Sequence, residues 1–420
     1  MSVNPLSQIL KSTSLDLSSY EDVYKYFHTN PELSLLEKAT SEKIAAHLSQ
    51  WNAYEIHQNI GGYGLVGVLR NGPGKTILLR ADMDALPVKE ITGLPYASTK
   101  TMADYSGTEQ PVMHACGHDM HITCLLAAAE LLAKTTSQWS GTLLVLFQPN
   151  EERGAGAQAM VDGGLYEKVP IPDYCFGQHV MRLRAGQIGL RNGTIMAAAD
   201  SMKITVFGRG GHGSLPHNAI DPALLAAHIV VRLQGIVSRE IDPTDLGVLT
   251  VGSLHVGQAE NVISDHAEIG LDFRTVKLET RQKIIEAIKR IATAECVASG
   301  SPKPPIFTPS RRFPPTDNDD LATNLLKSSF GDHFGGDFDP DTPRSNVSED
   351  FSTLGLCRGI PCGFWFLGGI EQGLWDRVQG GSEEEIPSNH SALFAPAIQP
   401  TMRAGVDALC LAALTFLKKE

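Results

Sequence analysis

Three histidines surround one cysteine in the segment MHACGHDMH, which contains His114, Cys116, His118 and His121. The segment directly precedes an apolar run at 122–133 that we expect to be a helix. A cysteine and a histidine two positions apart at a helix start can both point into one cleft, and borderline-soft divalent metals bind thiolate and imidazole. The alternative is a turn with a buried structural cysteine. A structural zinc site fits less well, because it needs four close ligands such as paired C-x-x-C motifs.

Four further segments place acids or histidines at or near expected strand ends. LLRADMDALP spans 78–87, LLVLFQPNEE spans 143–152, FGQHV spans 176–180 and SNHSALFAP spans 388–396. They contribute Asp82, Asp84, Glu151, Glu152, His179 and His390. Ligands of open α/β sheets bind beyond the carboxyl ends of the strands. One Glu-Glu pair alone is typical of a solvated helix start, but the segments together predict a metal site.

Adjacent carboxylates such as Glu151 and Glu152 can have separate roles. One can bind a metal, while the other faces a water whose pKa the metal lowers and acts as its general base. Asp84 is suited to accept a hydrogen bond from a ligand imidazole.

Alternating strands and helices must position these residues. β-rich runs occur at 64–70, 76–81, 142–147 and 174–180, and the helix between them presents one apolar face formed by Ile122, Leu125, Leu126, Ala129, Leu132 and Ala133. This alternation is typical of an α/β sheet. GFWFLGG at 363–369 is expected to be a further buried strand.

The pattern changes from about residue 195. Strands are expected at 202–210, 247–257, 267–275 and about 305–308, with helices from Pro222 to about 238 and at 280–300. Asp221 followed by Pro222 has the form of an N-cap with proline at the first helical position. The order β-α-β-β-α-β is typical of a ferredoxin-like module. We therefore predict an α/β domain with a central mixed sheet flanked by helices, formed by 1–194 and 309–420, and an inserted ferredoxin-like α+β domain at 195–308.

Composition excludes several classes of function. The 420 residues carry 47 acidic and 35 basic side chains and a net charge of -12, so a broad duplex-binding face is not expected. We find no stretch approaching the roughly 18 apolar residues that a membrane span needs, and the amino terminus does not resemble a signal peptide. Seven scattered cysteines predict reduced thiols and a cytoplasmic protein. No nucleic-acid or membrane partner is expected.

Eight motifs in order resemble the co-catalytic metal-dependent aminoacylase/carboxypeptidase amidohydrolases. Within that family the chain is most similar to the branch of hippurate hydrolase, N-acyl-amino-acid amidohydrolases and auxin–amino-acid conjugate hydrolases. The motifs span residues 28–396 and are HTNPELSLLE, LLRADMDALP, MHACGHDMH, FQPNEERGAGAQAM, GRGGHGSLPH, NVISDHAEIGLDFRT, SEDFS and SNHSALFAP.

The resemblance implies a catalytic α/β domain, a lid domain that mediates dimerisation, and a site for two divalent metal ions per subunit. Mn, Zn and Co all suit a mixed sulfur, nitrogen and oxygen site. Cys116 would bridge the two metals, His118, Glu152, His179 and His390 would complete the coordination, and Glu151 would be the general base. On the lid, His212 would reach the neighbouring subunit's site and stabilise the oxyanion, and Asn261 and Arg274 would hold the substrate carboxylate. Taken alone, His212 could be a loop histidine and Arg274 could pair with Asp272.

The expected activity is hydrolysis of the amide bond of N-acyl or aroyl amino acids, by attack of metal-bound hydroxide with Glu151 as general base. A dipeptidase or carboxypeptidase with the same machinery is the alternative, and a non-catalytic metal-dependent binding protein is disfavoured because Glu151 and all the ligands are present. The chain departs from the family at Ser264 and in VMRLRAG after His179, where prolines are usual. The acidic segment 370–387 precedes His390 and is expected to be a loop that shapes the acyl pocket.

Overall fold

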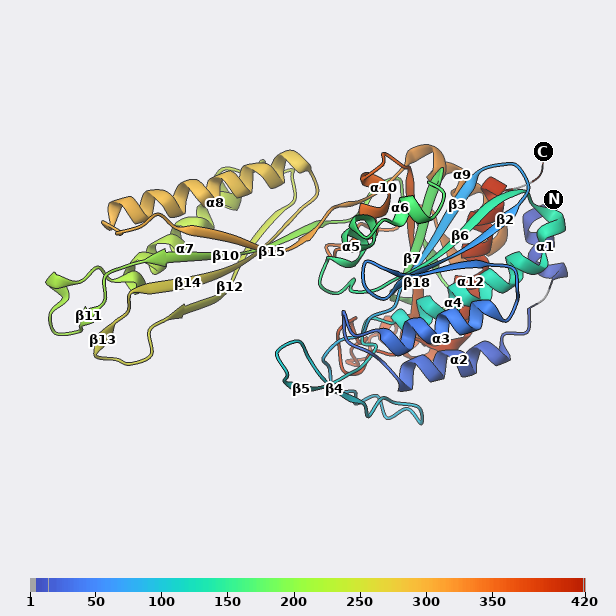
Figure 1. Ribbon diagram of the computed structural model, residues 1–420, viewed down its shortest axis with the longest axis horizontal. Coiled ribbons are helices and arrows are strands. Elements are labelled where there is room, and N and C mark those ends of the chain that lie inside the picture. Colours follow the sequence, from blue (N-terminus) through green and yellow to red (C-terminus); the bar gives the residue numbers. More distant parts are fainter. Residues whose placement is uncertain (1–4, 14, 418, 420) are drawn as a thin grey trace. The chain divides into compact units, whose positions relative to one another are not determined.

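The computed structural model describes residues 5–13, 15–417 and 419, and the chain divides into two compact units (Figure 1). The larger unit contains the chain up to Ile195, Asp317–Arg344 and the residues from Asp350 onward. The smaller unit contains Met196–Thr316 and Ser345–Glu349. The second boundary expected from the sequence lies near residue 308. The unit extends further because β15 (Ile306–Phe313) pairs along its length with β10 (Ala198–Phe207).

An eight-stranded mixed sheet forms the centre of the larger unit. Its strands, in spatial order, are β1 (Glu55–Ile60), β2 (Gly64–Asn71), β6 (Gly141–Gln148), β3 (Thr76–Asp82), β7 (Tyr174–Arg184), β18 (Cys362–Ile370), β8 (Ile188–Gly189) and β17 (Phe338–Asp339). The four central strands, β6, β3, β7 and β18, are parallel to one another. Their carboxyl ends therefore meet at one edge of the sheet, which is where the sequence places its acids and histidines.

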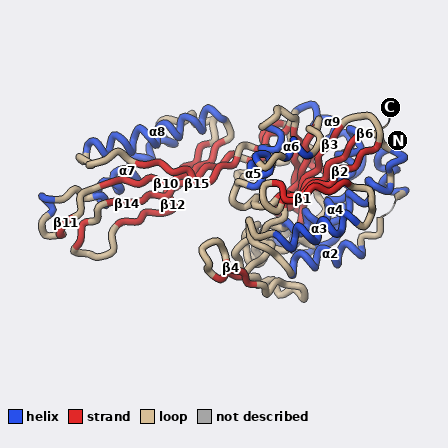
Figure 2. The backbone as a smooth tube through the Cα atoms, viewed as in Figure 1, coloured by secondary structure: helices blue, strands red, loops and turns tan. Residues whose placement is uncertain are grey.

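Helices cover both faces of this sheet, as the tube view shows (Figure 2). The helices described in the larger unit are α1 (Pro5–Ser12), α2 (Ser18–Thr29), α3 (Lys38–Ser49), α4 (His118–Lys134), α5 (Gly156–Asp162), α6 (Leu165–Lys168), α9 (Asp320–Phe334), α10 (Thr353–Leu356), α11 (Gln372–Gln379) and α12 (Ile398–Leu417). Alternate residues of β6, namely Leu143, Val145 and Phe147, point into the core that α4 and α12 share. This alternation follows from the two-residue period of a strand.

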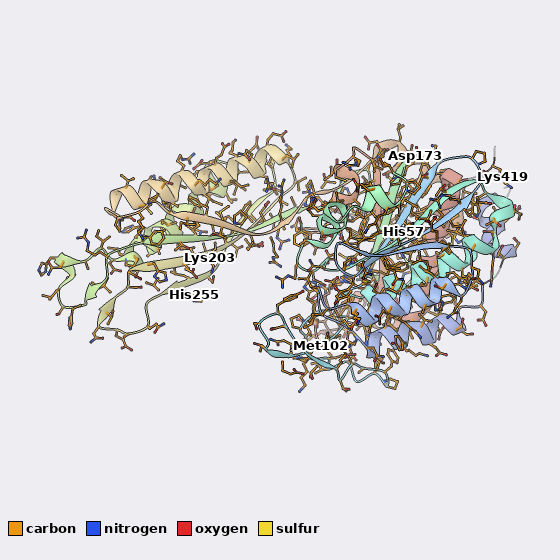
Figure 3. The ribbon with its side chains drawn as sticks, viewed as in Figure 1. His57, Met102, Asp173, Lys203, His255 and Lys419 are labelled. Carbon is orange, nitrogen blue, oxygen red and sulfur yellow. The ribbon has the colours of Figure 1, made fainter. Side chains whose placement is uncertain are left out.

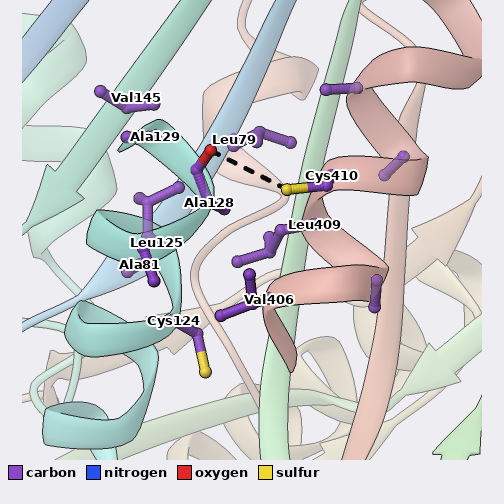
Figure 4. Close-up of a cluster of buried hydrophobic side chains, with 14 of the residues drawn as sticks. Leu79, Ala81, Cys124, Leu125, Ala128, Ala129, Val145, Val406, Leu409 and Cys410 are labelled. Atoms are coloured by element: carbon purple, nitrogen blue, oxygen red, sulfur yellow. Dashed lines mark hydrogen bonds between the residues drawn. The ribbon is translucent and has the colours of Figure 1, made fainter. Parts of the chain in front are cut away.

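Helix α12 is long and apolar enough to cross a membrane by length and composition, whereas the sequence analysis expected no such stretch. Most of it is buried inside the structure, where Val406 and Leu409 pack against α4. The Cys410 thiol donates to the carbonyl oxygen of Ala128 at 3.8 Å (Figure 4). The apolar residues on all sides of α12 are therefore explained by burial of this helix in the core.

The smaller unit has the predicted ferredoxin-like topology. Its antiparallel sheet has the order β12 (Gly247–Val256), β14 (His266–Thr275), β10, β15, and its two helices are α7 (Pro222–Arg239) and α8 (Leu278–Ala298). The predicted N-cap is confirmed, because the Asp221 carboxylate accepts the N–H of Ala223 at 2.8 Å. Lys203 of β10, which is labelled in Figure 3 together with His255 of β12, forms an ion pair with Glu268 of β14 at 3.0 Å.

Two local predictions differ from the structure. Helix α4 begins at His118 and not at 122, because Gly117 at its N-cap adopts φ 81 and turns the chain into the helix four residues earlier. The segment 370–387 was expected to be a loop, but it contains α11. The Glu371 carboxylate caps α11 by accepting the N–H groups of Gly373 and Leu374, both at 2.8 Å.

Candidate active site

A glycine turn brings Cys116 and His118 to the same side of the sheet edge. Gly117 has φ 81, a conformation that favours glycine, and a Cβ there would lie 2.4 Å from Cγ1 of Val180. The turn is thus packed directly against β7. The Sγ atom of Cys116 lies 3.5 Å from Nε2 of His179 on that strand.

The predicted ligands converge in overlapping groups. Within each group the donor atoms lie within 4.8 Å of one another, and the groups are Cys116, His118 and His179; Cys116, Glu152 and His390; and His118, Glu151 and Glu152. Cys116, His118 and Glu152 each belong to two of these groups. The structure therefore brings together all the metal ligands and the general base named from the sequence.

Two donor atoms at the centre of the site are buried without a hydrogen-bond partner in the part of the chain that the structure describes. They are Nε2 of His118 and Oε1 of Glu152, and they lie 3.8 Å apart. Burying polar atoms without partners costs free energy. A divalent cation would satisfy both, and the mixed thiol, imidazole and carboxylate donors suit a borderline-soft metal. The residues present therefore fit the metal site that the sequence predicts.

The electrostatics of the site favour an added positive charge. Burial raises the pKa of Glu152 to about 8, against the opposing effect of His118 and with the help of the neighbouring Asp84. Burial and the nearby Glu152 and Glu151 raise the pKa of the Cys116 thiol well above its usual value. A metal would reverse both effects, because a cation stabilises carboxylate and thiolate.

Asp84 holds the backbone of the two glutamates. Its carboxylate accepts the N–H groups of Glu151 and Glu152, each at 3.1 Å, and the hydroxyl of Ser34 at 2.7 Å. Nδ1 of His118 lies 2.8 Å from the carbonyl oxygen of Asp84 and 3.4 Å from its carboxylate. The nearer acceptor for the imidazole is thus the main chain of Asp84, while its side chain fixes the turn that presents Glu151 and Glu152.

His390 approaches the site from the loop before α12. Nε2 of the His390 ring lies 3.3 Å from Oε2 of Glu152. The backbone N–H of His390 donates to the carbonyl oxygen of Ala115 at 2.8 Å. The preceding Asn389 donates to the carbonyl oxygen of Val180 at 3.0 Å. These bonds connect the loop to the Cys116 turn and to β7, which explains how His390, 274 positions further along the chain, reaches Cys116.

Sequence reasoning missed a buried network beneath the ligands. Asp82 accepts from Arg80 Nη1 at 2.6 Å, and its other oxygen lies 2.6 Å from Nδ1 of His121. Nε2 of His121 accepts the N–H of Val180 at 2.8 Å, so Nδ1 carries the hydrogen that is donated to Asp82. Arg80 also donates to Gln148 at 2.9 Å. Asp82 and His121 were named from the sequence but without these roles, and Arg80, a charged residue inside an apolar strand, was a further signal.

The remaining predicted residues belong to the smaller unit. His212 lies in β11 (Gly211–His212), pairs with Val262 of β13 (Val262–Ile263), and accepts from Ser214 Oγ at 2.8 Å. His212 and Asn261 line a cavity of about 930 Å³ within this unit. Arg274 lies near the carboxyl end of β14, whereas Asn261 lies before the amino end of that strand.

Two partners within the smaller unit bind the Arg274 guanidinium. It donates to Asp272 at 2.9 Å and to Ser348 at 2.8 Å. The Asp272 pair considered from the sequence is therefore present.

Comparison with known proteins decides the family. Residues 78–390 match the model of peptidase family M20/M25/M40. The chain belongs to this family. It is 40% identical to hippurate hydrolase of Campylobacter jejuni, over 84% of this chain and 89% of that protein. It is 38% identical to thermostable carboxypeptidase 2 of Saccharolobus solfataricus, over 96% of this chain and 98% of that protein.

A solved structure of the family has the same fold. The Bacillus subtilis protein described as a dinuclear metal-binding peptidase of family M20 has a TM-score of 0.75 and 27% identity, covering 97% of this chain and 100% of that one. The family resemblance and the fold class inferred from the sequence are confirmed, and this M20 chain is an amidohydrolase.

Proposed function

We propose that this M20 amidohydrolase cleaves the amide bond of N-acyl amino acids, including aroyl amino acids. The observation that carries the proposal is the convergence of the Cys116, His118 and His179 donors with Glu152, beside the buried Glu151. The 40% identity to hippurate hydrolase supports this substrate class, because hippurate is an aroyl amino acid.

Each residue has a distinct task in the proposed reaction. Cys116, His118, Glu152, His179 and His390 would hold two divalent cations. When bound, these cations polarise the amide carbonyl and lower the pKa of water at the site. Glu151 takes the proton from the attacking water and delivers it to the amide nitrogen as the C–N bond breaks. Asp84 fixes the backbone at Glu151 and Glu152, because its carboxylate accepts a hydrogen bond from the N–H group of each.

Replacement of Glu151 tests the proposal. Glu151→Gln keeps the shape of the side chain but removes the proton acceptor, so turnover of N-benzoylglycine should fall roughly a hundred-fold or more. Metal content measured on the same preparation should be unchanged. Near-normal turnover in this variant would show that another group accepts the proton.

A carboxypeptidase or dipeptidase is the second candidate, favoured by the 38% identity to thermostable carboxypeptidase 2. A dipeptidase differs from an N-acyl-amino-acid hydrolase in the group beside the scissile carbonyl. An N-acyl amino acid is neutral there, whereas a dipeptide carries a free ammonium. Comparing the rates on N-acetylated and free forms of one dipeptide therefore separates dipeptidase activity from cleavage of N-acyl amino acids.

We also propose that the smaller unit mediates homodimerisation. Its sheet ends in two edge strands, β12 and β15. Edge strands expose unpaired backbone groups, and pairing two of them across a two-fold axis would cover both.

A further inference from the structure

A cavity of about 410 Å³ lies in the larger unit beside the candidate metal centre. Its lining includes a continuous apolar surface formed by Leu33, Leu36, Ala85, Leu86 and Pro87. Leu33 and Ala85 form a β-bridge and are buried, so this surface is part of the folded framework. The volume is within the range of roughly 300–1,000 Å³ that is usual for small-molecule sites.

The cavity adjoins the proposed reaction centre through two of its lining residues. Glu152 lines it and is also a candidate metal ligand. Ser34 lines it and donates to the Asp84 carboxylate, which holds the glutamate turn. A group that fills the cavity would therefore lie directly beside the atoms that bind and activate the amide.

A small hairpin forms one wall of the cavity. Strands β4 (Thr101–Ala103) and β5 (Glu109–Pro111) pair antiparallel, and Asp104, Tyr105 and Ser106 at the turn between them line the cavity. Met102 of β4, labelled in Figure 3, packs against the buried cluster that contains Leu33 and Ala85. The hairpin is thus anchored on the same apolar residues that line the cavity.

Hydrogen bonds within the turn connect Asp104 to three of the residues that follow it. The Asp104 carboxylate accepts from Ser106 Oγ at 2.6 Å, from the N–H of Thr108 at 3.1 Å and from Gln110 at 3.2 Å. The same donors, Ser106 first, lower the pKa of Asp104 to about 2. Asp104 therefore stays negatively charged at neutral pH.

Tyr105 is held at the tip of the hairpin from two directions. Its hydroxyl donates to the carbonyl oxygen of Leu35 at 3.3 Å, and the guanidinium of Arg153 lies 5.7 Å from the centre of its ring. The residue is nevertheless 61% exposed. An aromatic ring held in place yet open to solvent is suited to stacking against a planar ligand.

The charges around the cavity indicate which part of a substrate it accepts. Asp104 offsets the charge of Arg153, which is the one cation among the described lining residues, and Glu152 is a candidate metal ligand. A substrate carboxylate placed here would find no uncompensated cation among these lining side chains, while a neutral apolar group would meet the apolar surface. The amino-acid end of the substrate is therefore disfavoured, and the acyl end is favoured.

The size of the cavity excludes the smallest acyl group as a good fit. An acetyl methyl is about as large as a water molecule, whose share of liquid volume is about 30 Å³, so most of the 410 Å³ would stay unfilled. We propose that this cavity is the acyl subsite, that its occupant is an aromatic acyl group, and that Tyr105 determines this specificity. The identity of the occupant as an acyl group rests on the proposed function.

This assignment moves the acyl pocket away from the segment expected to shape it. The residues that line the cavity come from 33–36, 85–87, 104–106 and 152–153. None of the described residues at 370–387 is among them. The specificity is thus assigned to the β4–β5 hairpin and the apolar surface beside it.

Paired substrates with the same leaving group test the assignment. In metal-loaded full-length enzyme, kcat/KM is measured for N-benzoylglycine and N-acetylglycine. Tyr105→Ala should lower the value for N-benzoylglycine about five- to ten-fold and change the value for N-acetylglycine less than about two-fold, as expected from loss of an aromatic pair. Leu36→Trp, which fills the cavity, should lower the benzoyl rate more than ten-fold with the same small effect on the acetyl rate. Equal changes for both substrates, or none, would overturn the assignment.

Tyr26→Ala is the matched control. Tyr26 is also an exposed tyrosine with a cation over its ring, Lys43 at 4.6 Å, but it does not line the cavity. The control should leave the ratio of the two kcat/KM values unchanged. If Tyr26→Ala changes the ratio as much as Tyr105→Ala does, the cavity is not the cause of the substrate preference.

A binding measurement separates failure of this inference from failure of the proposed function. Calorimetric titration with benzamide and acetamide reports on the cavity without turnover of an N-acyl amino acid. If the wild type cleaves neither N-acyl substrate, the proposed function fails; benzamide binding that is lost in Leu36→Trp would still support an aromatic subsite. The assignment of an aromatic subsite would be overturned if Leu36→Trp leaves benzamide binding unchanged. It would also be overturned if the wild type does not prefer benzamide over acetamide.

Discussion

Nε2 of His118 and Oε1 of Glu152 face each other across 3.8 Å, and both are buried without a hydrogen-bond partner among the described residues. Asp84 holds the backbone at Glu152, and the Gly117 turn directs His118 toward it. The pair is most simply explained by a cation that both atoms bind.

Metal removal should abolish activity. Chelation should give inactive protein, and adding back a divalent metal should restore turnover of N-benzoylglycine, because the buried donors need a cation to organise the site. Cys116→Ser should bind less metal, since a hydroxyl is a far weaker ligand than a thiolate. Elemental analysis of each preparation checks both statements. Cys124→Ser is the matched control, because Cys124 is a buried thiol outside the ligand groups. Full activity in protein shown to be metal-free would refute the metal site.

Metal affinity should increase with pH. In the metal-free protein the pKa of Glu152 is raised to about 8, and that of His118 to about 10, because Asp82, Asp84 and Glu152 outweigh the effect of burial. Both groups therefore hold protons at neutral pH and must release them to bind a metal. The dissociation constant should fall up to about ten-fold per pH unit for each proton released. Calorimetry in two buffers of different ionisation enthalpy counts the protons, and zero release at pH 7 would contradict the argument.

Recognition of the substrate carboxylate should depend on Arg274. A guanidinium can bind a carboxylate through two parallel hydrogen bonds. Arg274→Ala should therefore raise KM for N-benzoylglycine about ten-fold or more and reduce the preference for it over its carboxamide. Arg311→Ala is the control, because Arg311 also approaches Asp272, at 3.9 Å. An unchanged preference in Arg274→Ala would assign Arg274 to the ion pair with Asp272 alone.

A mixture of two inactive variants tests the proposed dimer. If His212 acts at the partner subunit's site, a heterodimer of His212→Ala and Glu151→Gln has one site with both residues intact. Subunit exchange should then recover part of the activity, up to about a quarter of the wild-type value if exchange is random and each site acts independently. Size-exclusion chromatography and light scattering report the oligomeric state, and exchange is verified with labelled subunits. Verified exchange without recovery would exclude action of His212 in the partner's site.

The sequence by itself determined the features that depend on local order and residue type. Asp221 and Pro222 indicated the start of α7, β-rich runs indicated the central strands, and the segments around Cys116, Glu151 and His390 indicated the family. These predictions succeeded because a cap, a β-rich run or a motif is set by neighbours in the chain.

Only the tertiary structure decided which distant groups meet. Asp84 accepts the N–H groups of residues 67 and 68 positions away, and Arg80 reaches Gln148 from the next strand. Tyr105 becomes part of a cavity only because its hairpin packs on Leu33 and Ala85. Such contacts depend on strand register and on backbone groups that every residue carries, and residue types alone therefore leave them unspecified.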